Sequence, residues 1–135
     1  MNLDGFALPV KKLKGTDPVE TLDLSSKGLG VSSAIVIASL IGVNGSLTSL
    51  NLWNNNIGNE GAIAIAKGLE LNGSLTKLNI SSNQIGPEGA KEIAKSLSVT
   101  GSLTKVLAFP LESAIAIFCI IVHSSIFALL VCHAA

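Results

Sequence analysis

Two kinds of hydrophobic spacing alternate along much of the chain. Leu50 and Leu52 are each flanked by polar residues, and Leu78 and Ile80 repeat this arrangement. An apolar residue at every second position predicts a short strand with one buried face. Farther along, apolar residues recur at helical spacing, most clearly at Ala62, Ile65, Ala66 and Leu69. That spacing predicts a helix with one apolar stripe. The two spacings together predict a unit of one strand followed by one helix.

This strand–helix unit recurs every 28 residues. The repeat is marked by the tetrapeptide Gly-Ser-Leu-Thr, which begins at Gly45, Gly73 and Gly101. One such unit cannot bury its apolar face alone, so neighbouring units must stack. We therefore predict an α/β solenoid, with a curved parallel sheet inside and helices outside. Residues 1–16 form a leader, either a loose basic arm or a partner of the first strand. The predicted units are 17–44, 45–72, 73–100 and a partial fourth at 101–106.

The pattern LxxLxLxxNxIG fits residues 47–58 and again residues 75–86. On these residues the chain resembles the leucine-rich-repeat family. Its repeat length and the motif GAxxIA resemble the ribonuclease-inhibitor-like subclass, which includes the repeats of NOD-like receptors. We expect Asn55 and Asn83 to form a structural ladder, because buried loop amides and carbonyls need hydrogen-bond partners. Lys27 replaces the equivalent Asn in the first unit, so the ladder should weaken there.

The resemblance also implies a binding surface. In this family the outward-facing strand residues line a concave face. Carried onto this chain, the candidate contact residues are Ser49, Asn51, Trp53, Lys77, Asn79 and Ser81, preceded by Thr21, Asp23 and Ser25. Trp53 is the only Trp, and an exposed aromatic among small polar residues can anchor a partner; the alternative is a partly covered Trp without one. The implied function is a non-catalytic module that binds a protein partner.

The end of the chain has a different composition. Residues 113–135 carry no charge, and the mean hydropathy of 114–132 is roughly 2.6. As a helix this stretch would span about 28 Å, close to the thickness of a bilayer core. We predict a hydrophobic C-terminal helix at 114–132 within a tail at 107–135, as a candidate transmembrane anchor. All nine Lys precede it. The positive-inside rule then predicts a single-pass protein with its repeats facing the cytosol; the alternative is a cytoplasmic protein.

Two other interpretations of the tail stay open. The tail could cover the end of the solenoid as a cap, although a cap should carry a polar outer face. It could also be an artefactual continuation, because the fourth unit loses its pattern after Val106. In that case the chain is a truncated or structural fragment of a longer repeat array with no independent function.

Composition and motifs exclude several other functions. The 135 residues carry a net charge of +0 and no Arg, so we expect no nucleic-acid partner. We find no nucleotide-binding or catalytic motif, and therefore predict no enzyme, no catalytic residue and no cofactor. Cys119, His123, Cys132 and His133 could supply zinc ligands, but a hydrophobic helix offers them no polar supporting groups, so we predict no metal site. A Cys119–Cys132 disulfide is also not expected, because the two residues would lie about 20 Å apart along a helix, beyond the reach of a disulfide.

Overall fold

The computed structural model describes residues 2–99, 102–103, 105–107 and 129–131. Strands β1 (Asn2–Leu3) and β2 (Phe6–Ala7) form an antiparallel hairpin. A parallel sheet follows in the order β3-β4-β5-β6-β7. Its strands are β3 (Thr21–Asp23), β4 (Ser49–Asn51), β5 (Lys77–Asn79), β6 (Lys105–Leu107) and β7 (Leu129–Val131). The helices are α1 (Val10–Lys14), α2 (Val31–Ile41), α3 (Gly58–Leu71) and α4 (Pro87–Val99).

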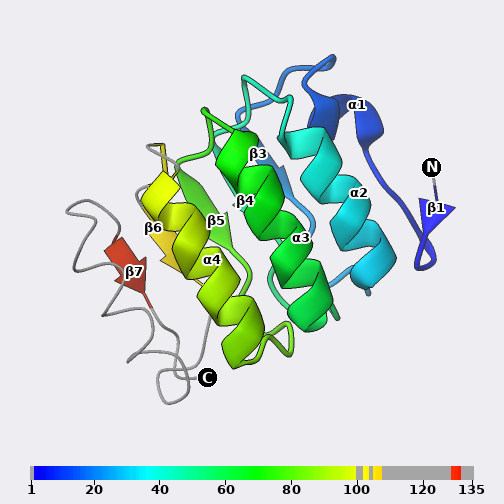
Figure 1. Cartoon of the computed structure of the whole chain (residues 1–135). Coiled ribbons are helices and arrows are strands. Elements are labelled where there is room, and N and C mark those ends of the chain that lie inside the picture. The colour runs from blue at the N-terminus through cyan, green and yellow to red at the C-terminus, as the bar shows by residue number, and fades with distance from the viewer. Residues whose placement is uncertain (1, 100–101, 104, 108–128, 132–135) are drawn as a thin grey trace.

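The sheet register reproduces the repeat period of the sequence. Leu22 pairs with Leu50, Leu50 pairs with Leu78, and Leu78 pairs with Val106. Each strand residue therefore lies beside the residue 28 positions later, up to β6. Figure 1 shows α2, α3 and α4 side by side in one layer over the sheet. The predicted α/β solenoid of parallel strands and helices is confirmed for these units.

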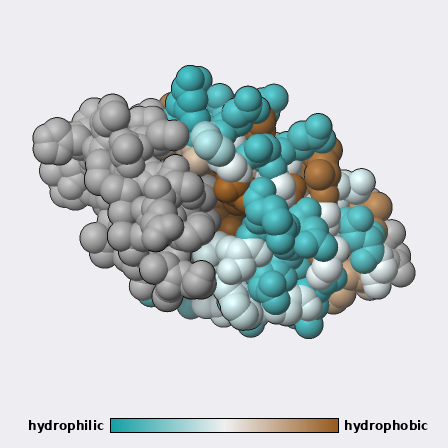
Figure 2. Space-filling view, turned by 90° about the horizontal axis from the view of Figure 1, so that it is seen from below, coloured by the Kyte–Doolittle hydropathy of each residue, from teal (hydrophilic) through white to brown (hydrophobic). Residues whose placement is uncertain are grey.

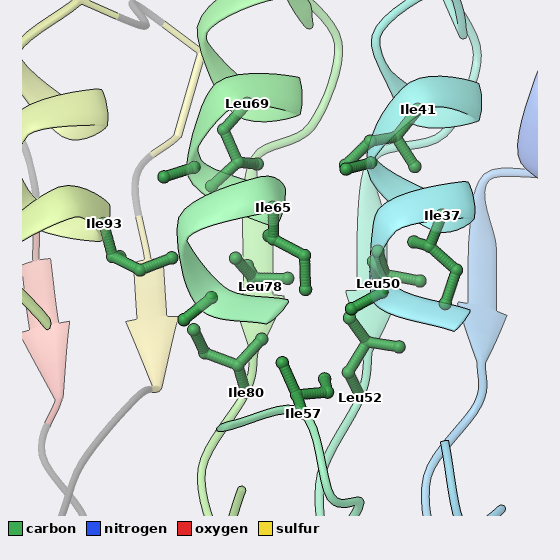
Figure 3. Close-up of a cluster of buried hydrophobic side chains, with 14 of the residues drawn as sticks. Ile37, Ile41, Leu50, Leu52, Ile57, Ile65, Leu69, Leu78, Ile80 and Ile93 are labelled. Carbon is green, nitrogen blue, oxygen red and sulfur yellow. The ribbon is translucent and has the colours of Figure 1, made fainter. Parts of the chain in front are cut away.

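The hydrophobic core lies between the sheet and this helix layer (Figure 3). Leu50 and Leu52 reach it from the strand segment, and Ile65 and Leu69 reach it from α3. Small residues set the distance between the helices. A Cβ added to Gly68 in α3 would lie 2.5 Å from the backbone oxygen of Ala38 in α2. The two helices therefore approach each other as closely as their backbones allow.

The leader is neither a loose arm nor a partner of β3. Its hairpin and α1 cover the first end of the solenoid, where Leu8 and Leu13 are buried in the core. The Asp4 carboxylate lies at the start of α2, where it accepts hydrogen bonds from the Gly30 amide, at 2.9 Å, and from the amide and hydroxyl of Ser33. These bonds satisfy donors that would be unpaired at a helix start. The leader therefore acts as an N-terminal cap.

The prediction of a helix at 114–132 is wrong at Leu129–Val131. These residues form β7, in which Leu130 pairs with Val106 of β6. Three consecutive apolar residues fit a sheet as well as a helix, so the hydropathy of the tail could not distinguish the two. The remainder of 114–132 and the zinc candidates, including Cys119 and His123, lie outside the described residues. In the described part of the chain, no helix has the length and hydropathy needed to cross a membrane.

Candidate functional site

The candidate site is the face of the parallel sheet opposite the helices, which we call the strand face. It consists of the outward residues of β3, β4 and β5 and the residue that follows each strand. Its exposed members are Thr21, Asp23, Trp53 and Lys77, and its half-buried members are Ser25, Ser49, Asn51 and Asn79. The structure therefore brings eight of the nine candidate contact residues together on an accessible surface.

Ser81 is the exception, and the expectation that it contacts a partner is corrected. Its side chain is only 3% exposed. The Ser81 hydroxyl donates a hydrogen bond to the Asn79 side-chain oxygen at 2.7 Å. Ser25, at the same position in the first unit, donates the same bond to Asp23 at 2.6 Å but stays half-buried. The Ser81 hydroxyl is thus used within the fold.

An acidic or amide side chain ends each of the three strands in the same way. The side-chain oxygens of Asp23, Asn51 and Asn79 accept hydrogen bonds from the backbone amides two residues later, at 2.9, 3.0 and 3.1 Å. Asx turns of this kind turn the chain out of the sheet. We did not predict this structural role, although the recurrence of Asp or Asn at this position was visible in the sequence. Within the described residues, the Asn51 and Asn79 amide nitrogens make no hydrogen bond and stay available as donors.

The strand face carries both signs of charge. The hydroxyl and backbone amide of Ser25 hold the pKa of Asp23 below its ordinary value, with a smaller contribution from the Lys27 ammonium. Asp23 is therefore ionised at neutral pH. Lys77 stands on the other side of Trp53, on β5, and is exposed. The face can thus orient a partner that carries complementary charges.

Trp53 is the largest exposed side chain of this face. It follows β4, and 44% of its surface is exposed. Its backbone is held on both sides, because its amide donates to Asn51 and its carbonyl oxygen accepts from the Ser26 amide at 2.9 Å. An exposed indole on a fixed backbone loses little conformational entropy when it is buried by a partner.

Asn55 and Asn83 lie in the loops that follow β4 and β5 and are buried. The Asn55 oxygen accepts from the amides of Lys27 and Leu29 at 2.9 and 3.1 Å. The Asn83 oxygen repeats this one unit later with the amides of Asn55 and Ile57, at 3.1 and 3.4 Å. Each Asn amide nitrogen donates to two or more loop carbonyls. These two residues thus form a continuous ladder between units.

The ladder ends at Lys27, which occupies the Asn position of the first unit. Its side chain is exposed, and its ammonium lies 5.7 Å from the centre of the Phe6 ring in the cap. A Lys side chain has no acceptor atom and cannot continue the ladder. At this position the first unit contacts the cap through a cation–π contact in place of an Asn hydrogen bond.

A second ladder, which we did not predict from the sequence, runs along the edge where the helices end. Asn44 and Asn72 are buried, and their oxygens accept from the amides two and three residues later. The Asn72 nitrogen donates to the carbonyl oxygens of Ile41 and Asn44, at 2.7 and 3.2 Å. The Asn44 nitrogen donates to those of Lys12 and Leu13 in the cap. The signal was the repeated Asn-Gly-Ser-Leu.

Comparison with known protein families finds matches in two segments that begin within two residues of the units 45–72 and 73–100. The family described as Leucine Rich repeat matches residues 43–66 and 72–94. These two matched segments are leucine-rich repeats. The ribonuclease-inhibitor-like subclass stays a prediction. No curated protein matches this leucine-rich-repeat chain in sequence.

A solved structure, "Leiomodin-1 Actin-Binding Site 2 (ABS2)", is similar to this leucine-rich-repeat chain, with a TM-score of 0.83 and 20% sequence identity. The match covers 93% of this chain and 77% of that chain. At this identity the likeness shows a shared fold. Actin binding is a property of the other protein.

Proposed function

We propose that this leucine-rich-repeat chain is a non-catalytic interaction module that binds a protein partner through its strand face. The exposure of Trp53 on a fixed backbone carries this proposal. Aromatic side chains of this kind contribute a large share of the binding energy at protein interfaces. The small polar residues around it can contact a partner closely without obstructing the indole.

The proposed contact has three chemical parts. Trp53 enters an apolar pocket of the partner, and the free amide nitrogens of Asn51 and Asn79 donate to its carbonyl oxygens. Asp23 and Lys77, of opposite charge on the flanking strands, set the orientation. Such charges at the rim govern orientation and association rate more than affinity.

Actin is the first candidate partner to test, because the similar solved structure is named an actin-binding site. That support rests on a shared fold, so the assay includes actin beside partners captured from cells. A binding curve with purified actin distinguishes a direct contact from co-purification. Failure to bind actin would exclude actin as the partner but would not contradict the strand face as the binding surface.

The test compares Trp53→Ala with Leu71→Ala in the full chain. Leu71 is a matched control, because it is also a large apolar side chain, 77% exposed, but lies at the end of α3 away from the strand face. With a purified partner, we expect Trp53→Ala to raise Kd at least about 10-fold. Leu71→Ala should bind like the unsubstituted chain. The proposal fails if Leu71→Ala weakens binding and Trp53→Ala does not.

The single-pass location with cytosolic repeats stays a separate prediction, supported by the hydropathy of the tail. This prediction conflicts with β7. When Leu129–Val131 pair with β6, the uncharged stretch left for a membrane span is shorter and covers only residues 113–128. A membrane span needs roughly 17 residues or more. An anchored chain would therefore have to release β7 from the sheet.

A further inference from the structure

Two Asn residues of this chain are followed directly by Gly: Asn44 precedes Gly45, and Asn72 precedes Gly73. Because Gly has no Cβ, its backbone nitrogen can approach the preceding side chain with little hindrance. In a flexible chain that nitrogen attacks the Asn side-chain carbon, and a carbon–nitrogen bond forms as a succinimide ring. The proton of the Gly nitrogen leaves with the side-chain nitrogen as ammonia. Water then opens either carbon–nitrogen bond of the ring, which gives aspartate or isoaspartate.

The folded chain opposes this reaction at both sites. Asn44 and Asn72 form the second ladder and are 3% and 4% exposed. Ring closure would break the bonds of the Asn72 nitrogen to Ile41 and Asn44 and those of its oxygen to the following amides. The backbone of Asn72 is also extended, with ψ 133°. The ring needs Cβ and the Gly73 nitrogen nearly eclipsed about the Cα–carbonyl bond, and an extended backbone keeps them apart.

The products cannot rebuild the ladder. Aspartate at position 72 would place a carboxylate oxygen where the amide nitrogen now donates to the Ile41 and Asn44 carbonyls. Three acceptors would then meet without a donor, and one would carry a buried charge. Isoaspartate also adds a methylene to the backbone, which displaces the amides of Ser74 and Leu75 from their acceptor. The same argument holds at Asn44, whose nitrogen donates to two carbonyls of the cap.

We propose that Asn44 and Asn72 are latent deamidation sites. The stacked repeats protect them. Once this edge of the solenoid opens, each forms a succinimide with the loss of ammonia, and water then opens the ring. Their conversion then prevents the repeats from stacking again, so that prolonged unfolding becomes irreversible. This proposal does not depend on the proposed binding function.

The glycines provide a matched control. At Gly45 and Gly73 no atom lies within 4 Å of the position that a Cβ would take, and neither backbone has a positive φ. The double variant Gly45→Ala/Gly73→Ala should therefore fold like the unsubstituted chain. Its added Cβ atoms hinder ring closure in the unfolded state. The variant changes the reaction and leaves the ladder intact.

The experiment incubates the full chain and the double variant at neutral pH, with and without guanidinium chloride. Peptide mass spectrometry follows the amide-to-acid conversion at residues 44 and 72. We expect conversion in denaturant and conversion at least about 100-fold slower in the folded chain, because reaction there requires opening. After dilution of the denaturant, far-ultraviolet circular dichroism measures the refolded fraction. The unsubstituted chain should lose refoldable material in step with conversion, whereas the double variant should retain it.

Two results would overturn the proposal. Equal conversion rates in the folded and unfolded chain would show that the ladder gives no protection. Converted chains that refold as completely as the double variant would show that the amide nitrogens are dispensable.

Discussion

Replacing Asn55 by Ala removes the side chain that joins the first two units. Its oxygen accepts from the amides of Lys27 and Leu29, and its nitrogen donates to the carbonyls of Leu24 and Leu52. All four bonds lie in the buried or partly buried interior. Ala leaves the two amides and the Leu24 carbonyl without the partner that the fold supplies, whereas the Leu52 carbonyl keeps its hydrogen bond from the Asn83 nitrogen.

The expected cost follows from the number of groups left unpaired. A buried donor or acceptor without a partner costs about 1–3 kcal/mol. Water entering the space of the lost amide recovers part of that cost. We therefore expect a loss of about 3–5 kcal/mol from the free energy of unfolding. This is a large share of the roughly 5–15 kcal/mol that stabilises a domain.

Urea unfolding followed by far-ultraviolet circular dichroism measures this loss. With a slope of about 1–3 kcal/mol per molar urea, the midpoint should fall by at least about 1 M. Asn56→Ala is the matched control, because Asn56 is adjacent and its side chain is exposed; its change should stay within about 0.5 kcal/mol. Equal midpoints for Asn55→Ala and Asn56→Ala would refute the structural role of the ladder.

Three further predictions concern the helices, the cap and the tail. Gly68→Ala should lower the urea midpoint. The added Cβ would clash with the Ala38 backbone, which costs about 1–3 kcal/mol, whereas the better helix propensity of Ala recovers about 1 kcal/mol. A raised midpoint would contradict the close approach of α2 and α3. Asp4→Ala should cost about 1 kcal/mol at pH 7. The Ser33 hydroxyl and then the Gly30 amide lower the folded-state pKa of Asp4. The stability that Asp4 contributes is therefore complete above its unfolded-state pKa of about 3.9, and it disappears as the pH falls through the folded-state pKa. The midpoints of Asp4→Ala and the unsubstituted chain should therefore converge in acid, and a constant difference would exclude this linkage. The hydropathy of the tail predicts retention of the full chain in membranes after alkaline carbonate extraction; release would exclude the anchor and agree with β7 in the sheet.

The periodic part of this fold could be predicted because each position meets the same surroundings in every unit. Leu50 and Leu78 are buried as the alternation of apolar and polar residues indicated. Asn44 and Asn72 recur with the same period but were missed. Asn followed by Gly is typical of any exposed turn, so the pair carried no sign of burial. Only the packing of α1 and the helix ends against these loops reveals it.

The remaining differences come from contacts that do not repeat. Asp4 caps a helix that begins 27 residues later, and no spacing in the sequence predicts such a contact. Ser81 and Ser25 occupy the same repeat position but differ in burial, because burial depends on neighbouring units as well as on the unit itself. At Leu129–Val131 a short apolar run was compatible with either a strand or a helix.

Seen from the edge where the helices begin, hydrophilic side chains cover much of the described surface (Figure 2). A partner could therefore meet this polar surface instead of the strand face. The central claim is that it meets the strand face, at Trp53. That claim needs a measurement that reports position directly.

Site-specific photocrosslinking in cells provides that measurement. A photoreactive amino acid is placed at Thr21 or Lys77, which are exposed on the strands flanking Trp53, or at Leu71 as the distant control. We predict an adduct with the same protein from both strand-face positions and none from position 71. An adduct that forms from position 71 and from neither strand-face position would contradict the proposed binding face.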